Sequence, residues 1–398
     1  MNSPKFLKQT IGLIIVFLAG CATPAPTLSP TLPPPPTGPL PPTSAQPVPP
    51  TVQPRLFTLV RSVTVTPVDN ITSGSFVRVG YVPGRDRIIV TFKARLTKAG
   101  CNNIYANDIY AYGYREYTKD MVETGNQGVF SCLTGPDIGG GFIGDNFYAV
   151  AMDRDPASNL EGWLLAEYNA VNWTSLVAPF FHPLAIGELD DDPMVALVNG
   201  QIDISSHYKS AGEIGPGHAT HHQFFTPDLQ FVTNRVITDT SHINLTSLLV
   251  VNGVINFITS TDLWGDMIVM QYDTNWNYLG MKTIKERASA PEGAAFDGTR
   301  FYVSYIDNSA CNPGTLCKDN VRLAAFDANW NLLDDIAVTN FGPQDLKAPG
   351  RPSMTLYNGL IYVCYDQNEN ATSAEIDSNP DTANIQVHVE VYEFTQKP

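Results

Sequence analysis

Acidic side chains recur at equivalent points of a repeating strand pattern in this chain of 398 residues. Asp192 and Glu292 stand before predicted strands, whereas Asp307 and Asp366 follow the next strand of their units. A separated carboxylate pair can act as acid and base in glycoside hydrolysis. Asp also caps turns and loop amides, and its regular recurrence agrees with that structural role. We predict Asp192 and Glu292 as catalytic carboxylates, with Arg351 near them. No cofactor motif is evident, although Ca²⁺, which prefers oxygen ligands, could occupy such a cluster.

The same strand ends carry aromatic and polar side chains that suit ligand binding. They open onto the longest predicted loops, such as residues 206–222 and 366–384, while the turns at the opposite ends are short. Long loops gathered on one face commonly carry function. The predicted ligand-binding residues are His207, Tyr208, Tyr305, Asp307, Tyr365 and Asp366. Three tryptophans fall at equivalent short turns on the opposite face, and we expect packing roles for them: Trp173, Trp276 and Trp330.

Four of the seven histidines lie within residues 207–222. His221 and His222 must point to opposite faces of an extended strand, so they cannot both bind one ion. His207, His218 and one of that pair could form a metal site with Glu213. The alternative is hydrogen bonding within a long loop, and we predict no metal ligands here.

A pattern of apolar strand, tight turn and apolar strand recurs six times between Arg55 and Pro398. The turn glycines are Gly84, Gly144, Gly200, Gly253, Gly298 and Gly359. Four of them follow Asn or Asp, which predicts type I′ hairpins, because both central residues of that turn need a positive φ. The flanking runs are rich in Val, Ile, Tyr and Phe, as half-buried strands require.

A second hairpin follows each first one, most clearly in residues 267–284 and 321–339. Each unit is therefore predicted as four antiparallel strands in about 55 residues, and it resembles a β-propeller blade. The final segment, 385–398, lacks a fourth strand, and residues 56–67 can supply it without leaving an open edge. We predict an all-β, six-bladed propeller with four-stranded antiparallel blades, its last blade closed by an N-terminal strand. A pair of β-sandwiches is the alternative.

Arginine, tyrosine and glutamate side chains converge on the predicted loop face. Arg287 and Arg351 lie in connections there, near Tyr305, Tyr365 and Glu292. This combination resembles that of the sialidases, which implies an enzyme that acts on glycans. The departures are that no SxDxGxxW turn is present and that a third arginine is not evident. The sequence also contains no GxSxG, HExxH or P-loop motif.

The N-terminus has the pattern of an export signal. Lys5 and Lys8 precede the apolar run Ile11–Leu18, which is too short to span a bilayer. The run ends in Leu18-Ala19-Gly20-Cys21, which resembles the lipobox of bacterial lipoproteins and implies a lipid on Cys21. Residues 1–20 are thus predicted as signal peptide and 55–398 as the propeller domain. Between them, residues 21–54 hold 14 of the 31 prolines and no charge, as expected for an extended spacer.

The other cysteines suggest disulfides, which an exported protein is free to form. Cys311 and Cys317 bracket a Pro-Gly turn in one predicted loop. Cys101 and Cys132 fall in two connections on the same face, so a second bridge is predicted there. Cys364 lies within an apolar strand and is expected to be an inert core thiol.

The formal net charge of −15, without a Lys/Arg-rich run, excludes a binder of nucleic acid phosphates. The leading hypothesis is an extracytoplasmic lipoprotein of the bacterial cell envelope, held to the membrane by the lipid on Cys21. Its propeller would bind an extracellular glycan or protein through the long-loop face. The alternatives are an anchored glycan-processing enzyme that uses the channel-mouth carboxylates, and a structural interaction module of the envelope.

Overall fold

The structure is a computed structural model. It describes residues 56–65, 71–96, 110–131, 138–154, 160–184, 189–209, 219–237, 246–261, 265–309, 320–342, 345, 347–369 and 385–395. For residues 71–75, 94–96, 110, 153–154, 189–192, 207–209, 219 and 348 it describes the backbone alone. The chain divides into two units, Met1–Gln53 and Pro54–Pro398, and every described residue belongs to the second.

The described part of the chain is built almost wholly of β-strands. The first twelve are β1 (Phe57–Val65), β2 (Ile71–Val82), β3 (Arg87–Leu96), β4 (Tyr110–Tyr117), β5 (Glu123–Ser131), β6 (Ile138–Ile143), β7 (Asn146–Arg154), β8 (Glu161–Asn169), β9 (Thr174–Pro183), β10 (Leu189–Val198), β11 (Gln201–Lys209) and β12 (Ala219–Phe225). The others are β13 (Phe231–Ile237), β14 (Ser247–Val251), β15 (Val254–Ser260), β16 (Met267–Asp273), β17 (Tyr278–Lys285), β18 (Ala288–Phe296), β19 (Phe301–Asp307), β20 (Asn320–Phe326), β21 (Leu332–Ala337), β22 (Ala348–Tyr357), β23 (Leu360–Asn368) and β24 (Ile385–Phe394). Among these residues the one helical element is a single 3₁₀ turn, Pro83–Arg85.

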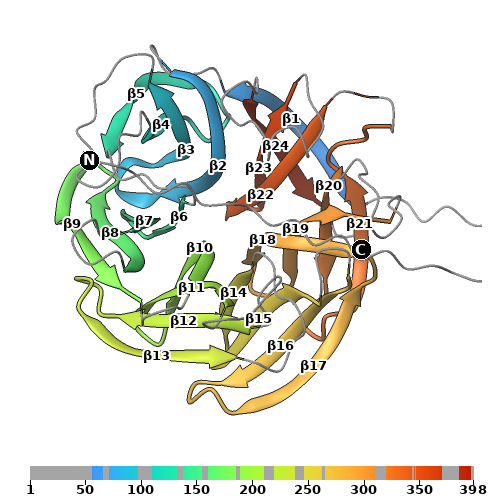
Figure 1. The fold of residues 1–398 in the computed structure, drawn as a ribbon. Helices are drawn as coiled ribbons and strands as arrows, with labels where there is room; N and C mark the ends of the chain where they lie inside the picture. Colours follow the sequence, from blue (N-terminus) through green and yellow to red (C-terminus); the bar gives the residue numbers. More distant parts are fainter. Residues whose placement is uncertain are drawn as a thin grey trace, which may run out of the picture. The chain divides into compact units, whose positions relative to one another are not determined.

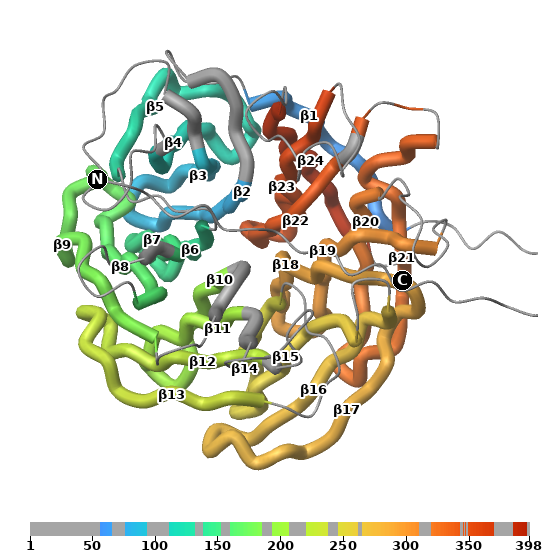
Figure 2. The backbone as a smooth tube through the Cα atoms, viewed as in Figure 1, coloured from blue at the N-terminus to red at the C-terminus, as the bar shows by residue number. Residues whose placement is uncertain are grey.

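The strands form four four-stranded sheets and one eight-stranded sheet. The large sheet consists of two antiparallel halves, β6–β9 and β10–β13, which meet only where Gly140 of β6 pairs in parallel with Met194 of β10. The first strands of the sheets, β2, β6, β10, β14, β18 and β22, surround a common centre, while fourth strands such as β9, β13 and β17 lie at the rim (Figures 1 and 2). The fold is all-β and of propeller type.

The hairpin turns between first and second strands follow the sequence prediction closely. Asn199 and Gly200 have φ values of 52° and 78°, and Asn252-Gly253 and Asn358-Gly359 are nearly identical to them. Both residues of each pair thus have the positive φ of a type I′ turn. Two turns differ. Gly84 lies in the 3₁₀ turn, and Asp86 takes the positive φ of 55° instead. At Asp297-Gly298, also predicted as type I′, only Gly298 has a positive φ, of 98°, so that prediction is wrong.

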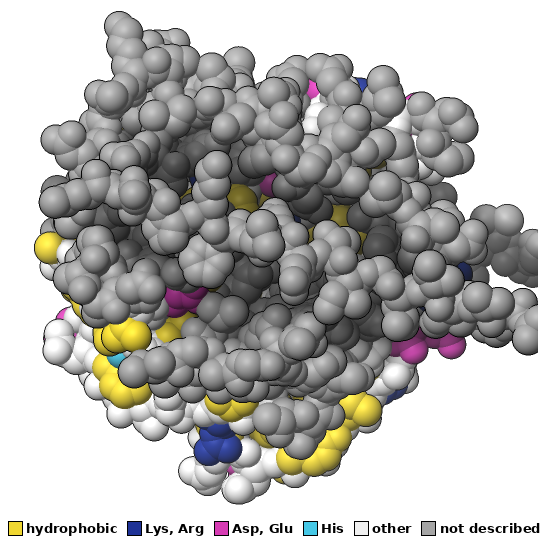
Figure 3. Space-filling view, in the orientation of Figure 1, with side chains coloured by type: hydrophobic (Ala, Val, Ile, Leu, Met, Phe, Trp, Pro, Cys, Tyr) yellow, Lys and Arg dark blue, Asp and Glu magenta, His cyan; other side chains and the backbone are white. Residues whose placement is uncertain are grey.

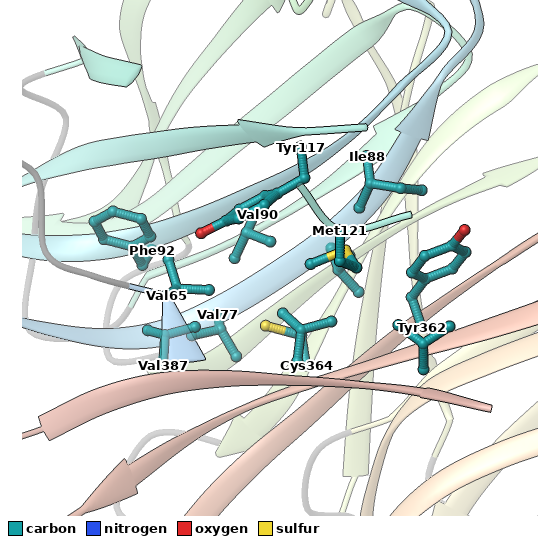
Figure 4. Close-up of a cluster of buried hydrophobic side chains, with 13 residues drawn as sticks. Val65, Val77, Ile88, Val90, Phe92, Tyr117, Met121, Tyr362, Cys364 and Val387 are labelled. Atoms are coloured by element: carbon teal, nitrogen blue, oxygen red, sulfur yellow. The ribbon is translucent and has the colours of Figure 1, made fainter. Parts of the chain in front are cut away.

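The core consists of apolar clusters between neighbouring sheets. Figure 4 shows one such cluster, in which Val90 and Tyr117 face Cys364 and Val387 across the contact between two sheets. Cys364 is a free thiol and fully buried, as expected from its apolar strand. The predicted packing role of the tryptophans is also confirmed: Trp330 stacks on Phe301 at 4.0 Å between ring centroids.

The N-terminal strand β1 pairs with the C-terminal strand β24. Their antiparallel register runs from Phe57 opposite Phe394 to Val65 opposite Val387. In addition, Asp334 of β21 accepts hydrogen bonds from the amides of Leu56 and Phe57, at 2.7 and 3.2 Å. The sheet order β1-β24-β23-β22 therefore joins the two ends of the described chain.

Several sequence predictions fall outside the described residues. They include the signal peptide, the lipid on Cys21, the spacer, and the bridges Cys311–Cys317 and Cys101–Cys132. Within the described ranges, no helix has the length and apolar character needed to cross a membrane.

Candidate functional site in the central channel

The first strands of the sheets line one central cavity of about 500 Å³. Each strand contributes a short run, such as Arg78–Tyr81 from β2 and Glu292–Phe296 from β18. The end where these strands begin carries polar side chains, namely Arg78, Ser205, Thr246, Ser247, Glu292 and Ser353. Convergent polar groups at one end of a cavity of this size are typical of a ligand site.

Arg78 and Glu292 form an ion pair across this end of the cavity. Arg78 Nη1 lies 3.2 Å from Glu292 Oε2, and both side chains are almost completely buried. Arg78 also donates through Nε to the carbonyl of Gly140 at 3.2 Å, and its Nη2 contacts the sulfur of Met194 at 2.9 Å. The guanidinium thus touches β6, β10 and β18 from its place on β2. The ion pair therefore joins two desolvated, opposite charges, and such charge-assisted contacts hold their partners in a fixed geometry.

Strand irregularities place these residues. The pairing of the first and second strands is interrupted between Ser75 and Arg78 in β2 and between Gly350 and Ser353 in β22. The same interruption occurs between Asp191 and Met194 in β10 and between Ser289 and Gly293 in β18. Bulges of this kind re-aim side chains and are common beside active sites.

Three of these bulges contain a non-glycine residue with positive φ. The values are 51° for Phe76, 47° for Ala290 and 39° for Arg351. L-residues avoid this region, and such backbone conformations gather at functional sites, where surrounding structure holds them. Equivalent strain in three sheets, around one end of one cavity, marks that end as the candidate site.

Asp366 and Arg351 extend the site behind β2. The Phe76 amide donates to Asp366 Oδ2 at 3.0 Å, and the Arg351 guanidinium lies 4.0 Å from the Phe76 ring centroid. Burial raises the pKa of Asp366 above its ordinary value, while the charges of Arg351 and Arg78 and the Phe76 amide oppose that rise. The environments of the two carboxyl groups therefore differ: burial raises the pKa of Asp366, whereas Glu292 is paired with Arg78.

Of the predicted site residues, Glu292 lines the cavity, while Arg351 and Asp366 lie behind Phe76 of β2 and do not line it. Tyr305 lies elsewhere, fully buried, and its hydroxyl donates to Asp335 at 3.0 Å. Arg322 binds Asp335 at 2.8 Å and Asp307 at 3.4 Å. Tyr305 and Asp307 thus belong to a polar network on the second, third and fourth strands of their sheet, and neither lines the cavity.

The remaining predicted residues are placed less fully. Tyr365 is buried and stacks on His388, with ring centroids 5.4 Å apart. Asp192 lies in the β10 bulge, at the position that Arg351 holds in β22, and each precedes a proline. His207 and Tyr208 pair with Asp191 and Asp190 near the start of β10. The side chains of Asp192, His207 and Tyr208 lie outside the described residues.

The histidine-rich segment yields a buried pair instead of a cluster. His222 Nδ1 lies 2.8 Å from Asp203 Oδ2, with both side chains fully buried. The His222 ring also packs against Trp276, with centroids 4.9 Å apart. Across the described residues no group of three or more His, Cys, Asp or Glu could hold a metal ion, and His218 and Glu213 lie outside them.

Sequence reasoning missed Arg78 and Phe76. Both stand in a run, FVRVGYV, that has the composition of an ordinary strand. The available signal was a charged residue within a first strand, as at Glu292 in β18 and Arg351 in β22. The bulge beside Arg78 contains no proline, whereas the bulges in β10 and β22 contain Pro193 and Pro352, which indicate a break in the strand pattern.

The comparisons with known proteins find similar folds but no similar sequences. No protein-family model matches the chain, and no curated protein sequence matches it. The sialidase of Trypanosoma rangeli, bound to 2,3-difluoro-KDN, aligns with 83% of the chain at 10% identity and a TM-score of 0.53. The same enzyme with 2,3-difluorosialic acid as covalent intermediate aligns with 84% at 10% identity and a TM-score of 0.51.

The alignment covers only part of that enzyme. This chain spans 58% and 59% of the length of the two sialidase structures. At 10% identity the likeness concerns the fold, which supports the propeller type of architecture.

Proposed function

We propose that this chain is a glycan-processing enzyme whose active site is the polar end of the central channel. The observation that carries the proposal is the pair of carboxyl groups in unlike environments: Glu292 forms a buried ion pair with Arg78, and burial raises the pKa of Asp366. Glycoside hydrolysis requires one carboxyl group that gives a proton and one that accepts it. The sialidase of similar fold adds support by analogy alone.

In the proposed reaction the protonated form of Asp366, which burial favours, gives its proton to the oxygen of the leaving group. Glu292 takes a proton from the water that adds to the anomeric carbon. Arg78 holds the Glu292 carboxylate in place, and the strained backbone at Ala290 fixes the direction in which Glu292 points. Asp192, which the sequence favours, is the other candidate for the second carboxylate, since its bulge lies at the same end of the channel.

We further propose that the propeller has six blades and is closed by β1, and that the chain is a lipoprotein anchored through Cys21. The pairing of β1 with β24 supports the closure. The sequence 18–21 and the uncharged spacer support the anchor and an extracytoplasmic location in the bacterial cell envelope. An anchored enzyme of this kind would meet extracellular glycans, held off the membrane by the spacer.

The test is a panel of chromogenic glycosides, run in parallel with a glycan array on the same preparation. We expect turnover of at least one glycoside, and loss of it in Glu292→Gln. Asp366→Asn and Asp192→Asn then show which of these two groups works with Glu292. The variant that lacks the proton donor should lose activity mainly toward glycosides with poor leaving groups, because those leaving groups need a proton. Array binding without turnover of any glycoside would refute the enzyme and leave a glycan-binding propeller, the leading hypothesis from the sequence.

A further inference from the structure

The central cavity changes from polar to apolar along its length. Its polar end carries Arg78 and Glu292, as described above. The strands β6 and β10 run in the same direction, since Gly140 pairs with Met194 in parallel. In each first strand the cavity lining ends some residues after the polar end. The last lining residues are Tyr81, Ile143, Leu197, Val250, Phe296 and Leu356.

The apolar end is the open end. Along β10 the side chains change from buried at Pro193 to 47% exposed at Leu197, and Val250 on β14 is 36% exposed. Along β18 the change is from buried at Gly293 to half-buried at Phe296. Exposed apolar side chains around the mouth of a cavity are a mark of ligand sites.

An aromatic pair stands at this mouth. The rings of Tyr81 and Tyr357 stack with centroids 3.6 Å apart and planes 23° apart. The Tyr81 hydroxyl donates to Asp86 Oδ1 at 2.8 Å, and Lys119 pairs with Asp86 at 3.0 Å. These bonds fix the rings, so the wall of the mouth is preorganised.

We infer that the apolar end binds the alkyl or aryl group of an amphiphilic ligand, inserted from the face of the short hairpin turns. A single molecule would then place its apolar group among Leu197, Val250 and Phe296, and its polar head toward Arg78 and Glu292. This rests on the proposed function only for the head, which would be a sugar; the ligand class is thus an alkyl or aryl glycoside, of which a glycolipid is the natural form. The face is opposite to the long loops on which the sequence places ligand binding.

The experiment measures binding of N-phenyl-1-naphthylamine, a neutral probe that fluoresces in apolar sites, to the full chain carrying Cys21→Ser, which prevents acylation. We expect one saturable site, and displacement by octyl β-D-glucoside below its micelle concentration but not by glucose. Leu197→Arg and Val250→Arg are each expected to weaken probe binding at least tenfold. Both positions are exposed, so the fold tolerates the change, and thermal melting checks this.

Leu279→Arg is the matched control, because Leu279 is 57% exposed but lies on the rim strand β17, where Figure 3 shows hydrophobic side chains. It should bind the probe like the unsubstituted chain. Unchanged binding in Leu197→Arg and Val250→Arg, equal loss in all three variants, or equal displacement by glucose would each overturn the inference. If the probe binds as expected but no glycoside is turned over, the proposed function is wrong and the apolar site is supported. If glycosides are turned over but the probe does not bind as expected, only the apolar site is wrong.

Discussion

Arg78 Nη1 lies 3.2 Å from Glu292 Oε2, and the pair joins β2 to β18 across the polar end of the channel. The same guanidinium bonds to β6 and contacts β10. Both side chains are buried, so the position of the Glu292 carboxylate depends on how the first strands β2, β6, β10 and β18 pack around Arg78.

Removal of Arg78 should be costly to stability. Arg78→Met leaves Glu292 buried without its counter-charge, which typically destabilises a protein by about 3–5 kcal/mol. Adding Glu292→Gln should recover part of this loss. Urea unfolding measures both, and Lys119→Met is the control, because its exposed pair with Asp86 should contribute about 1 kcal/mol or less. If Arg78→Met and Lys119→Met both lowered the free energy of unfolding by the same small amount, the buried pair would contribute no more to stability than the exposed one.

Asp366 should make stability fall with rising pH. Its pKa in the folded chain is raised above 3.8, mainly by burial, so the native state holds its proton longer than the unfolded state. The stability that this group contributes is present at low pH and lost as pH rises through the raised pKa. The unfolding free energy of the parent minus that of Asp366→Asn should therefore decrease between pH 4 and neutrality.

Asp273 provides a control of opposite sign. Hydrogen bonds from the Asn277 side chain lower the pKa of Asp273, so its contribution is present above the ordinary carboxyl range and lost on acidification. The same difference for Asp273→Asn should increase with pH. A flat or rising difference for Asp366→Asn would contradict its assignment as a buried carboxyl that favours its proton.

Ala290→Gly should leave the stability of the chain nearly unchanged. Relief of an L-residue in the left-handed region gains roughly 1–2 kcal/mol, whereas the added freedom of unfolded glycine costs about 0.5–1 kcal/mol and loss of the buried Ala290 methyl group costs about 0.8 kcal/mol. Ala294→Gly, on the same strand without positive φ, should instead lose about 1 kcal/mol. Thermal melting of the two variants compares them, and a loss in Ala290→Gly as large as in Ala294→Gly would argue against strain at the bulge.

Val63→Pro tests the proposed closure. Val63 of β1 pairs with Val389 of β24, and proline there is expected to weaken the pairing, because it has no amide donor and a fixed φ. If β1 closes the ring, hydrogen exchange should quicken in β24 and β23 and the whole domain should melt earlier. Thr283→Pro in the rim strand β17 is the comparison. If hydrogen exchange became faster in β1 alone, β1 would not be needed to close the propeller.

The repeat, its strands and its turns could be predicted from sequence because they depend on local pattern. Asn199-Gly200 fixes a turn through the φ values of two residues, and the alternating runs beside it fix the strands. The role of Glu292 could be suggested, since a carboxylate directly before an apolar strand is a local signal as well.

Its partner could not be predicted, because the ion pair depends on how strands from different sheets meet. Arg78 stands in a run that any strand could contain. The bulge before it, between Ser75 and Arg78, contains no proline that would have indicated a break in the strand pairing. Tyr305 shows the reverse error of pattern reasoning: its position near a strand end suggests a ligand contact, yet its ring turns toward Asp335 within its own sheet.

The most direct test of the central claim is kcat/KM of Glu292→Gln on the best glycoside of the panel, beside Glu390→Gln. Glu390 is also buried, and burial raises its pKa above the ordinary value, but it accepts a hydrogen bond from the Ser62 hydroxyl on β1 at 2.7 Å and does not line the cavity. Loss of a general acid or base typically costs on the order of 10²–10⁴-fold. We predict a loss of that size in Glu292→Gln and near-parental activity in Glu390→Gln. Equal activity of the two variants would contradict an active site at the polar end of the channel.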